Sequence, residues 1–298
     1  MNYVGEFAAL GTALCWASAW NLFAEAAGKM GSLVLNRLRI TAAWGFLTLT
    51  LWLVHRSGWP TWASGPAVMA LALSGMIGFI FGDSFGFRAI VILGPGRASL
   101  LASTAPLFTT ALAWPILHQH HGPLALLGML ITLAGTALVF TGPSTERKGH
   151  AEGSVTMGIV SGLLGAIGQA GGYILSSLAL RTGLDPLSAT VIRVGSACVA
   201  IWIMAGVSGQ VGGTVAALRD LRATLFMLAG ALMGPCLGVL LSLTSLQLIE
   251  AGVAASITAV APLFAMLMAA RFHHERLTWR ALGGCLIAVA GIVVLFRR

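Results

Sequence analysis

One carboxylate stands inside a strongly apolar stretch of this chain, residues 74–90, which read SGMIGFIFGDSFGFRAI. The acid is Asp83, and small residues recur around it at every fourth position: Ser74, Gly78, Gly82 and Gly86. A lipid-facing aspartate costs about 2.5–3.5 kcal/mol to insert into a membrane, so we expect Asp83 to face the protein interior or a cavity. There it could bind a solute, act in a proton relay, or only fix a neighbouring helix by hydrogen bonds.

Other polar and aromatic side chains in the apolar segments are candidates to line a solute cavity together with Asp83. They are Trp16, Asn21, Ser103, Gln169, Tyr173, Ser242 and Ser245. A single hydroxyl often bonds only to its own helix backbone, so each residue alone carries little weight. As a set they suit a polar organic solute better than a bare ion. We expect no catalytic residue, because the chain has no Walker-type, HExxH or GxSxG motif.

Two prolines and two arginines occupy matching places in the two halves of the chain. Pro106 and Pro262 stand inside apolar segments, where a proline frees a backbone carbonyl and kinks the helix. Such kinks could shape a central cavity or be purely structural bends. Arg39 and Arg193 suit either a scaffold role or pairing with an anionic group of the substrate.

Two histidine-rich strings resemble metal ligands: HQHH at 118–121 and HHE at 273–275. Both fall in short loops, and a structural zinc site needs four well-spaced ligands, so we predict no metal site and no cofactor. The four cysteines all lie in apolar segments without a short pairing motif, so no disulfide framework is expected.

The composition dictates the surroundings of these residues. Of 298 residues, 57% are hydrophobic and 9% are charged, whereas a soluble domain carries about 25% charged residues. We therefore predict an all-α integral membrane protein that crosses the cell membrane several times. The predicted location is the inner membrane of a bacterium. The excess of basic residues suits loops that face anionic lipid headgroups, and no basic cluster is long enough for nucleic-acid binding. The expected partners are the lipid bilayer and a small-molecule substrate, with the chain a monomer or weak dimer.

A membrane span needs about 20 mostly apolar residues, and ten segments qualify. Their approximate ranges are 5–26, 33–54, 66–88, 96–117, 123–141, 154–178, 187–207, 223–247, 250–271 and 279–296. The longest polar stretch, the linker 142–153, separates a first unit, 1–141, from a second unit, 154–298. Each unit contains five spans.

An internal repeat supports this division. GRASLLASTAPLF at 96–108 matches GVAASITAVAPLF at 252–264, and the two prolines are 156 residues apart. The same offset places Gly230, Gly234, Gly238 and Ser242 opposite the small residues around Asp83. It places Val239 opposite Asp83 itself. Because five is odd, consecutive copies must have opposite orientations, which predicts two inverted five-helix repeats with a site between them.

The repeated segments resemble the drug/metabolite transporter superfamily, in particular its EamA type. The resemblance is carried by SLLASTAPLFTTALAW at 99–114, GMLITLAGTALVF at 128–140 and ASITAVAPLFAMLMAARFHHERLTWRALGGCLIAVAGIVVLF at 255–296. Glu275 matches the loop glutamate of the family, whereas Gln119 stands at that place in the first copy. The resemblance implies ten helices in two inverted repeats, and export or exchange of small metabolites such as amino acids.

These observations predict a secondary transporter that works by alternating access, with Asp83 as the candidate proton-coupling residue. A membrane-embedded enzyme or lipid carrier, or a non-transporting scaffold, is the alternative. The orientation is open: the family pattern places both termini in the cytoplasm, whereas the distribution of Lys and Arg among the loops favours termini outside.

Overall fold

The computed structural model describes residues 3–93, 98, 101–140, 154–273 and 279–296. Within these ranges the chain forms helices and turns, without β-strands, so the all-α prediction is confirmed there. The predicted linker 142–153 and the loop residues His274 and Glu275 lie outside the described residues.

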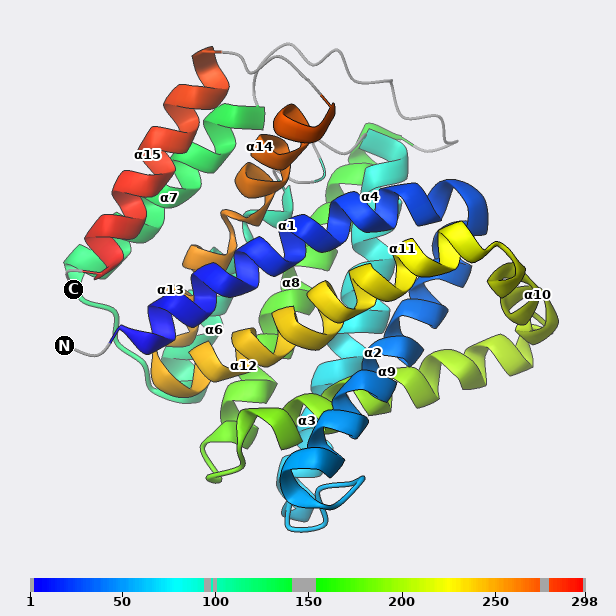
Figure 1. Ribbon diagram of the computed structural model, residues 1–298. Helices are drawn as coiled ribbons and strands as arrows, with labels where there is room; N and C mark the ends of the chain where they lie inside the picture. The colour runs from blue at the N-terminus through cyan, green and yellow to red at the C-terminus, as the bar shows by residue number, and fades with distance from the viewer. Residues whose placement is uncertain (1–2, 94–97, 99–100, 141–153, 274–278, 297–298) are drawn as a thin grey trace.

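Helices follow one another closely along the whole chain (Figure 1). The first half contains α1 (Val4–Met30), α2 (Ser32–His55), α3 (Gly65–Gly75), α4 (Asp83–Leu93), α6 (Ala105–Leu117) and α7 (Pro123–Phe140). The second half contains α8 (Val155–Leu180), α9 (Pro186–Val207), α10 (Val211–Ala216), α11 (Leu221–Ala231), α12 (Val239–Leu248), α13 (Ala251–Thr258), α14 (Ala261–His273) and α15 (Trp279–Phe296).

Among the described residues, 6 helical stretches are long and apolar enough to cross a membrane. Shorter apolar helices of 10–17 residues accompany them. Many large apolar side chains, such as Phe7, Trp114 and Leu286, lie on the outer surface, as contact with lipid requires. The number of ten crossings and their arrangement as inverted repeats stay predictions.

Each half contains one π-helical turn inside a long helix. The turn Met76–Gly82 joins α3 to α4, and the turn Leu232–Gly238 joins α11 to α12. In each case the amide following the turn bonds the carbonyl five residues back, Asp83 to Gly78 and Val239 to Gly234. The two turns have the same spacing as the sequence repeat, and such turns are frequent at functional sites.

The small residues around Asp83 allow two helix backbones to approach closely. A Cβ atom added to Gly168 of α8 would lie 2.8 Å from the Cα of Gly82, and one on Gly165 would lie 3.1 Å from the backbone nitrogen of Gly86. Packing in this way is typical of small residues four apart in membrane helices. In the second half, the corresponding helix packs against α1, where Gly234 faces Ala19 and Trp16.

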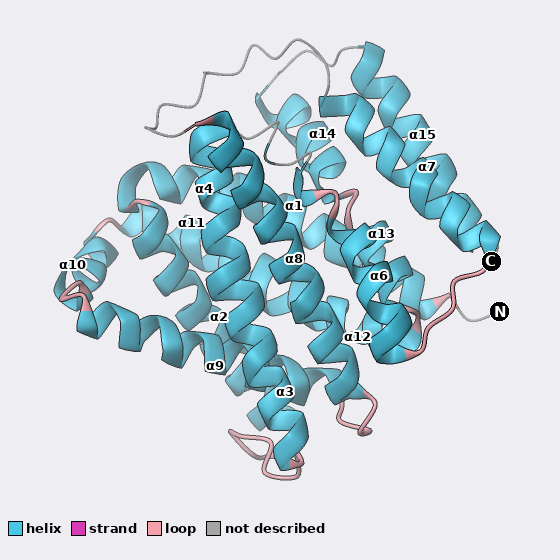
Figure 2. Ribbon diagram, turned by 180° about the vertical axis from the view of Figure 1, so that it is seen from behind, coloured by secondary structure: helices cyan, strands magenta, loops and turns pink. Residues whose placement is uncertain are grey.

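Helices α7 and α15 pack side by side in opposite directions at one edge of the molecule, as both views show (Figures 1 and 2). A Cβ atom on Gly135 would lie 2.3 Å from the nitrogen of Ala288, and one on Gly128 would lie 2.9 Å from Leu295. The contact therefore depends on glycine at these positions.

Candidate functional site

A cavity of about 260 Å³ lies among helices from both halves of the chain. Residues of α1, α2, α4, α6, α8, α13 and α14 line it, together with residues next to the first turns of α6 and α14. Asp83 and Gly86 in the first turn of α4 and Gly162 in the N-terminal half of α8 are part of its wall. The cavity thus lies beside the start of α4 and the N-terminal half of α8.

An ion pair forms the charged part of the wall. The Nη2 of Arg39 donates to the Oδ2 of Asp83 at 2.7 Å, and its Nε donates to the Oδ1 of Asn36 at 2.8 Å. The ring of Phe23 lies 5.2 Å from the guanidinium carbon. Both residues line the cavity; the side chain of Arg39 is 4% exposed and that of Asp83 is 16% exposed, so the carboxylate is the more exposed member of the pair.

Asp83 is therefore paired with a cation inside the protein. Its partner is Arg39 from another helix, and not the nearer Arg88, which contacts the sulfur of Met157. A separation of five residues places the side chains of Asp83 and Arg88 on different faces of one helix. The contact between α2 and α4 has no signal in the spacing of the sequence.

Two broken helices supply polar backbone groups to the same cavity. The chain turns at 103–104 before α6 and at 259–260 before α14, and Pro106 and Pro262 are the second residues of these helices. The prolines thus restart a helix after a break and do not kink a continuous one. Since proline has no N–H, the carbonyls of Ala102 and Thr258 lack the helical donor four residues on, and both residues line the cavity.

Five of the side chains predicted to bind substrate do line the cavity: Trp16, Asp83, Ser103, Gln169 and Tyr173. The other three lie elsewhere. Asn21 donates to the carbonyl of Ala17 in its own helix, and Ser242 and Ser245 are buried in the packing of α12. Arg39, for which the sequence allowed a scaffold role or pairing with the substrate, and Trp20 line the cavity as well.

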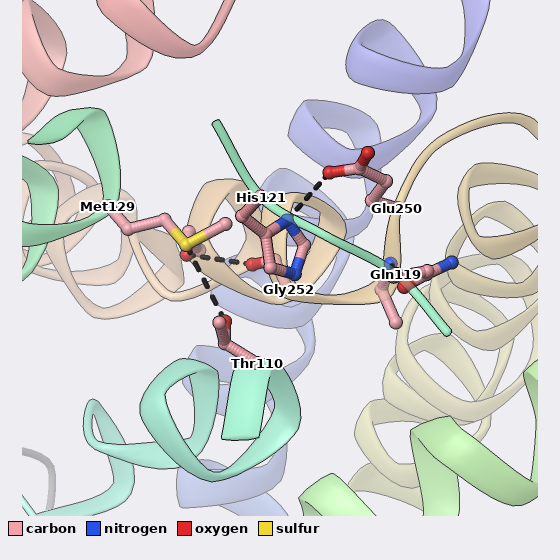
Figure 3. A network of polar contacts seen from close by, with 8 residues as sticks. Thr110, Gln119, His121, Met129, Glu250 and Gly252 are labelled. Atoms are coloured by element: carbon pink, nitrogen blue, oxygen red, sulfur yellow. Dashed lines mark hydrogen bonds and ion pairs between the residues drawn. The ribbon is translucent and has the colours of Figure 1, made fainter. Parts of the chain in front are cut away.

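At the opposite end of the bundle, polar side chains join the two halves (Figure 3). The Nδ1 of His121, between α6 and α7, lies 2.6 Å from the Oε2 of Glu250, between α12 and α13. The Oε1 of Gln119 accepts a hydrogen bond of 3.1 Å from the amide of Ala251. We call these two contacts the loop latch.

A second cavity, of about 430 Å³, lies next to the loop latch. Its wall includes Gln119, Ser177, Arg181 and Glu250. The Nη2 of Arg181 donates to the carbonyl of Leu117 at 2.6 Å, which adds a further tie between the halves. In the part of the chain that the structure describes, no group of three His, Cys, Asp or Glu side chains could hold a metal ion. His121 acts here as a partner of Glu250.

Comparison with known proteins identifies the architecture. The sequence model of the EamA-like transporter family matches residues 3–141 and, a second time, residues 156–297. The chain belongs to the EamA-like transporter family. It is therefore a membrane transporter and not an enzyme. Like the other members of the family, it is a multi-pass protein of the cell membrane.

Two individual proteins are similar to this EamA-like chain. A probable terminal-alkyne amino-acid exporter from Streptantibioticus cattleyicolor is 32% identical over 117 residues, which are 39% of this chain and 38% of that protein. The match thus spans less than half of the relative. A protein with a solved crystal structure superposes with a TM-score of 0.74 at 16% identity, over 99% of this chain and 96% of that one. That likeness concerns the fold alone.

Proposed function

We propose that this EamA-like protein exports a small amphipathic metabolite, an amino acid or a related compound, by alternating access. The observation that carries the proposal is the cavity with the Arg39–Asp83 pair, which is bounded by helices of both halves. A site between two repeats near discontinuous helices is typical of secondary transporters. The amino-acid exporter among its relatives supports the same substrate class.

The cavity has room for a compact solute with one apolar arm. Glycine and alanine residues of α6 and α8 form much of its wall, and the ring of Trp16 adds an aromatic surface. The carboxylate of Asp83 and the carbonyls of Ala102 and Thr258 are acceptors only, so they suit an ammonium group. An amino acid with a short unbranched side chain combines these two properties.

The loop latch suggests how alternation occurs. The latch lies where α6 and α12 end, whereas the cavity lies beside the first turn of α4. In this state the halves are joined at the latch end. Export requires that the latch opens while the helices around the cavity close at the other end.

Transport is tested with the full-length protein in liposomes. Radiolabelled norvaline and propargylglycine are five-carbon amino acids that fit the cavity, and counterflow reports exchange without any driving ion. We expect uptake into proteoliposomes that exceeds uptake into empty liposomes and is lost in Asp83→Ala. The exposed arginine Arg222, changed to glutamine, serves as a control with unchanged uptake. Equal uptake with and without protein would contradict the proposal.

Proton coupling through Asp83 is a separate part of the proposal. If Asp83 carries the coupling proton, Asp83→Asn should exchange norvaline but lose the dependence of net efflux on a pH gradient. Unchanged rate and unchanged pH dependence in Asp83→Asn would show that the residue has no coupling role.

A further inference from the structure

A second arginine is buried close to the cavity, and one of its donor groups has no hydrogen-bond partner among the described residues. Arg193 of α9 is 2% exposed, and its Nε has no hydrogen-bond partner among the described residues. Its guanidinium carbon lies 5.1 Å from the centre of the Phe79 ring. An arginine that is buried in a membrane protein normally pairs with an acid or with backbone carbonyls.

Two glycines make the space that holds this guanidinium. A Cβ atom on Gly78 would lie 3.0 Å from the Nη2 of Arg193, and one on Gly172 would lie 3.1 Å from it. The same position at Gly78 lies 3.7 Å from the Oε1 of Gln169, a residue that lines the cavity. Arg193 is therefore directly behind the part of the wall that Gln169 forms.

The charges around this wall do not balance. Arg39 is neutralised by Asp83, and Asp83 and Tyr173 are the electrostatic neighbours of Arg193. The position that would supply a second acid by the internal repeat is Val239. The described part of the region thus contains one more positive than negative charge, which is unfavourable in a membrane interior. A monoanionic group would correct this imbalance.

The first turns of the broken helices are weaker candidates for an anion. Pro106 and Pro262 each remove one N–H group from these turns. The amides of Leu107 and Phe108 already donate to the carbonyl of Thr104, and those of Leu263 and Phe264 donate to the carbonyl of Val260. The helix N-termini therefore have few donors left, whereas Arg193 has an unused one.

We propose that Arg193 binds the carboxylate of the transported solute, which enters beside Gln169, while the ammonium group faces Asp83. Arginine suits this role because its planar guanidinium can hold a carboxylate with two parallel hydrogen bonds. This assignment rests on the proposed transport of amino acids and names the residue that selects for their carboxylate.

The test compares two competitors that differ only in the carboxylate. Unlabelled norvaline and norvalinamide compete against radiolabelled norvaline in counterflow, and the ratio of their inhibitory concentrations measures carboxylate recognition. Thermal shifts of the purified protein with the same two compounds report binding for any variant that no longer transports. In the wild type we expect norvaline to be favoured about 10- to 100-fold, the size of a charge-assisted hydrogen bond.

The variants separate recognition from folding. Arg193→Gln should bring the ratio close to one, and Arg193→Lys should give an intermediate value. Gly172→Ala keeps the charge but displaces the guanidinium, so it should also reduce the ratio. Gly171→Ala, whose added methyl would meet only Ile77 at 3.4 Å, is the matched control with an unchanged ratio.

Two results overturn the assignment while leaving export intact. One is a wild type in which norvalinamide competes as well as norvaline. The other is an Arg193→Gln protein that keeps the wild-type ratio. If the wild type transports none of the amino acids, the proposed function fails at this first step, and the carboxylate assignment fails with it.

Discussion

Asp83 of α4 accepts a hydrogen bond of 2.7 Å from Arg39 of α2, across 44 positions of sequence. The pair connects two helices at the wall of the cavity. Among the described residues there is no equivalent pair in the second half, where Val239 stands in place of Asp83. The two halves therefore share a scaffold but differ in charge. Because of this asymmetry, one side of the cavity is polar, and a solute with one charged end would bind with that end toward the polar side.

Breaking the Arg39–Asp83 pair should destabilise the protein. Removing one member of a buried ion pair typically costs about 3–5 kcal/mol, and the partial exposure of Asp83 places Asp83→Asn at the lower end of that range. The double variant Arg39→Met with Asp83→Val, which copies the valine of the second half, should recover most of the loss. Thermal melting of the wild type, Arg39→Met, Asp83→Val and the double variant in detergent measures the coupling. A loss in the double variant that equals the sum of the two single losses would rule out a coupled pair.

The contact between α7 and α15 should not tolerate a methyl group at Gly135. A Cβ there would lie 2.3 Å from the nitrogen of Ala288, a backbone atom that cannot move aside alone. We expect Gly135→Ala to lower the free energy of unfolding by about 1–3 kcal/mol, as overpacking does. Gly45→Ala is the control, because Gly45 lies in α2 with nothing within 4 Å of an added Cβ. That variant should be neutral or slightly stabilising, since alanine favours helix. Similar melting temperatures for both variants would contradict this account.

Loss of the His121–Glu250 contact should loosen the latch end. A cysteine placed at Ser177, which is 4% exposed and lines the cavity behind the latch, serves as a reporter. In the Glu250→Gln background this cysteine should react with a water-soluble maleimide about 5- to 30-fold faster, as expected for a weakened charged hydrogen bond. Glu25→Gln on the exposed side of α1 is the control with unchanged labelling. A reaction rate at the reporter that does not depend on Glu250 would show that the contact does not close this end.

Acid should remove the contribution that Asp185, the residue before α9, makes to the stability of the folded protein. Burial alone would raise the pKa of Asp185, but hydrogen bonding with Ser188 and the nearby charge of His55 together outweigh burial and hold the pKa below its usual 3.8. The Oδ1 of Asp185 accepts from the amide of Ser188 at 2.9 Å, which caps the helix. Because the pKa of Asp185 is lower in the folded state, the ionised carboxylate stabilises the folded protein at every pH above the ordinary pKa. This stabilisation is lost as the pH falls through the folded-state pKa. Asp185→Ala should therefore cost about 1 kcal/mol at neutral pH.

The measurement for Asp185 is the difference in melting temperature between Asp185→Ala and the wild type as a function of pH. This difference should shrink below pH 4 and be smallest near pH 2, within the window that the lowered pKa defines. A difference that stays constant over the same range would mean that the cap does not act through its charge.

Much of the architecture follows from the sequence because it depends on local pattern. Apolar length locates the membrane helices, and the spacing of Gly78, Gly82 and Gly86 indicates close packing. The offset of 156 residues anticipates that both halves carry a π-helical turn at the same place, although nothing in the composition of Met76–Gly82 specifies that geometry. The breaks before Pro106 and Pro262 were predicted as kinks, since sequence shows the missing N–H but not where a helix restarts.

The site was harder to predict because its contacts join segments that are distant in the chain. Sequence marked Asp83, Gln169 and Tyr173 by their polarity in apolar surroundings, and all three line the cavity. It had no means to pair Asp83 with Arg39, or His121 with Glu250, because such pairs depend on how helices from different segments pack. Ser242 and Ser245 illustrate the converse, since polar residues of a helix also fill its buried side.

The π-helical turn Met76–Gly82 lies immediately before Asp83, and this placement has a mechanical consequence. A π turn contains about one residue more than an α turn, so its conversion to an α turn rotates everything beyond it by about 100° relative to the preceding helix. Asp83 is the first residue beyond the turn, so it would swing away from Arg39 without any change in the rest of α3. The turn Leu232–Gly238 of the second half also precedes Val239, but it contains Pro235, and a rotation there would move only a hydrocarbon side chain. Of these two turns, the one before Asp83 is therefore the one whose rotation would displace a charge.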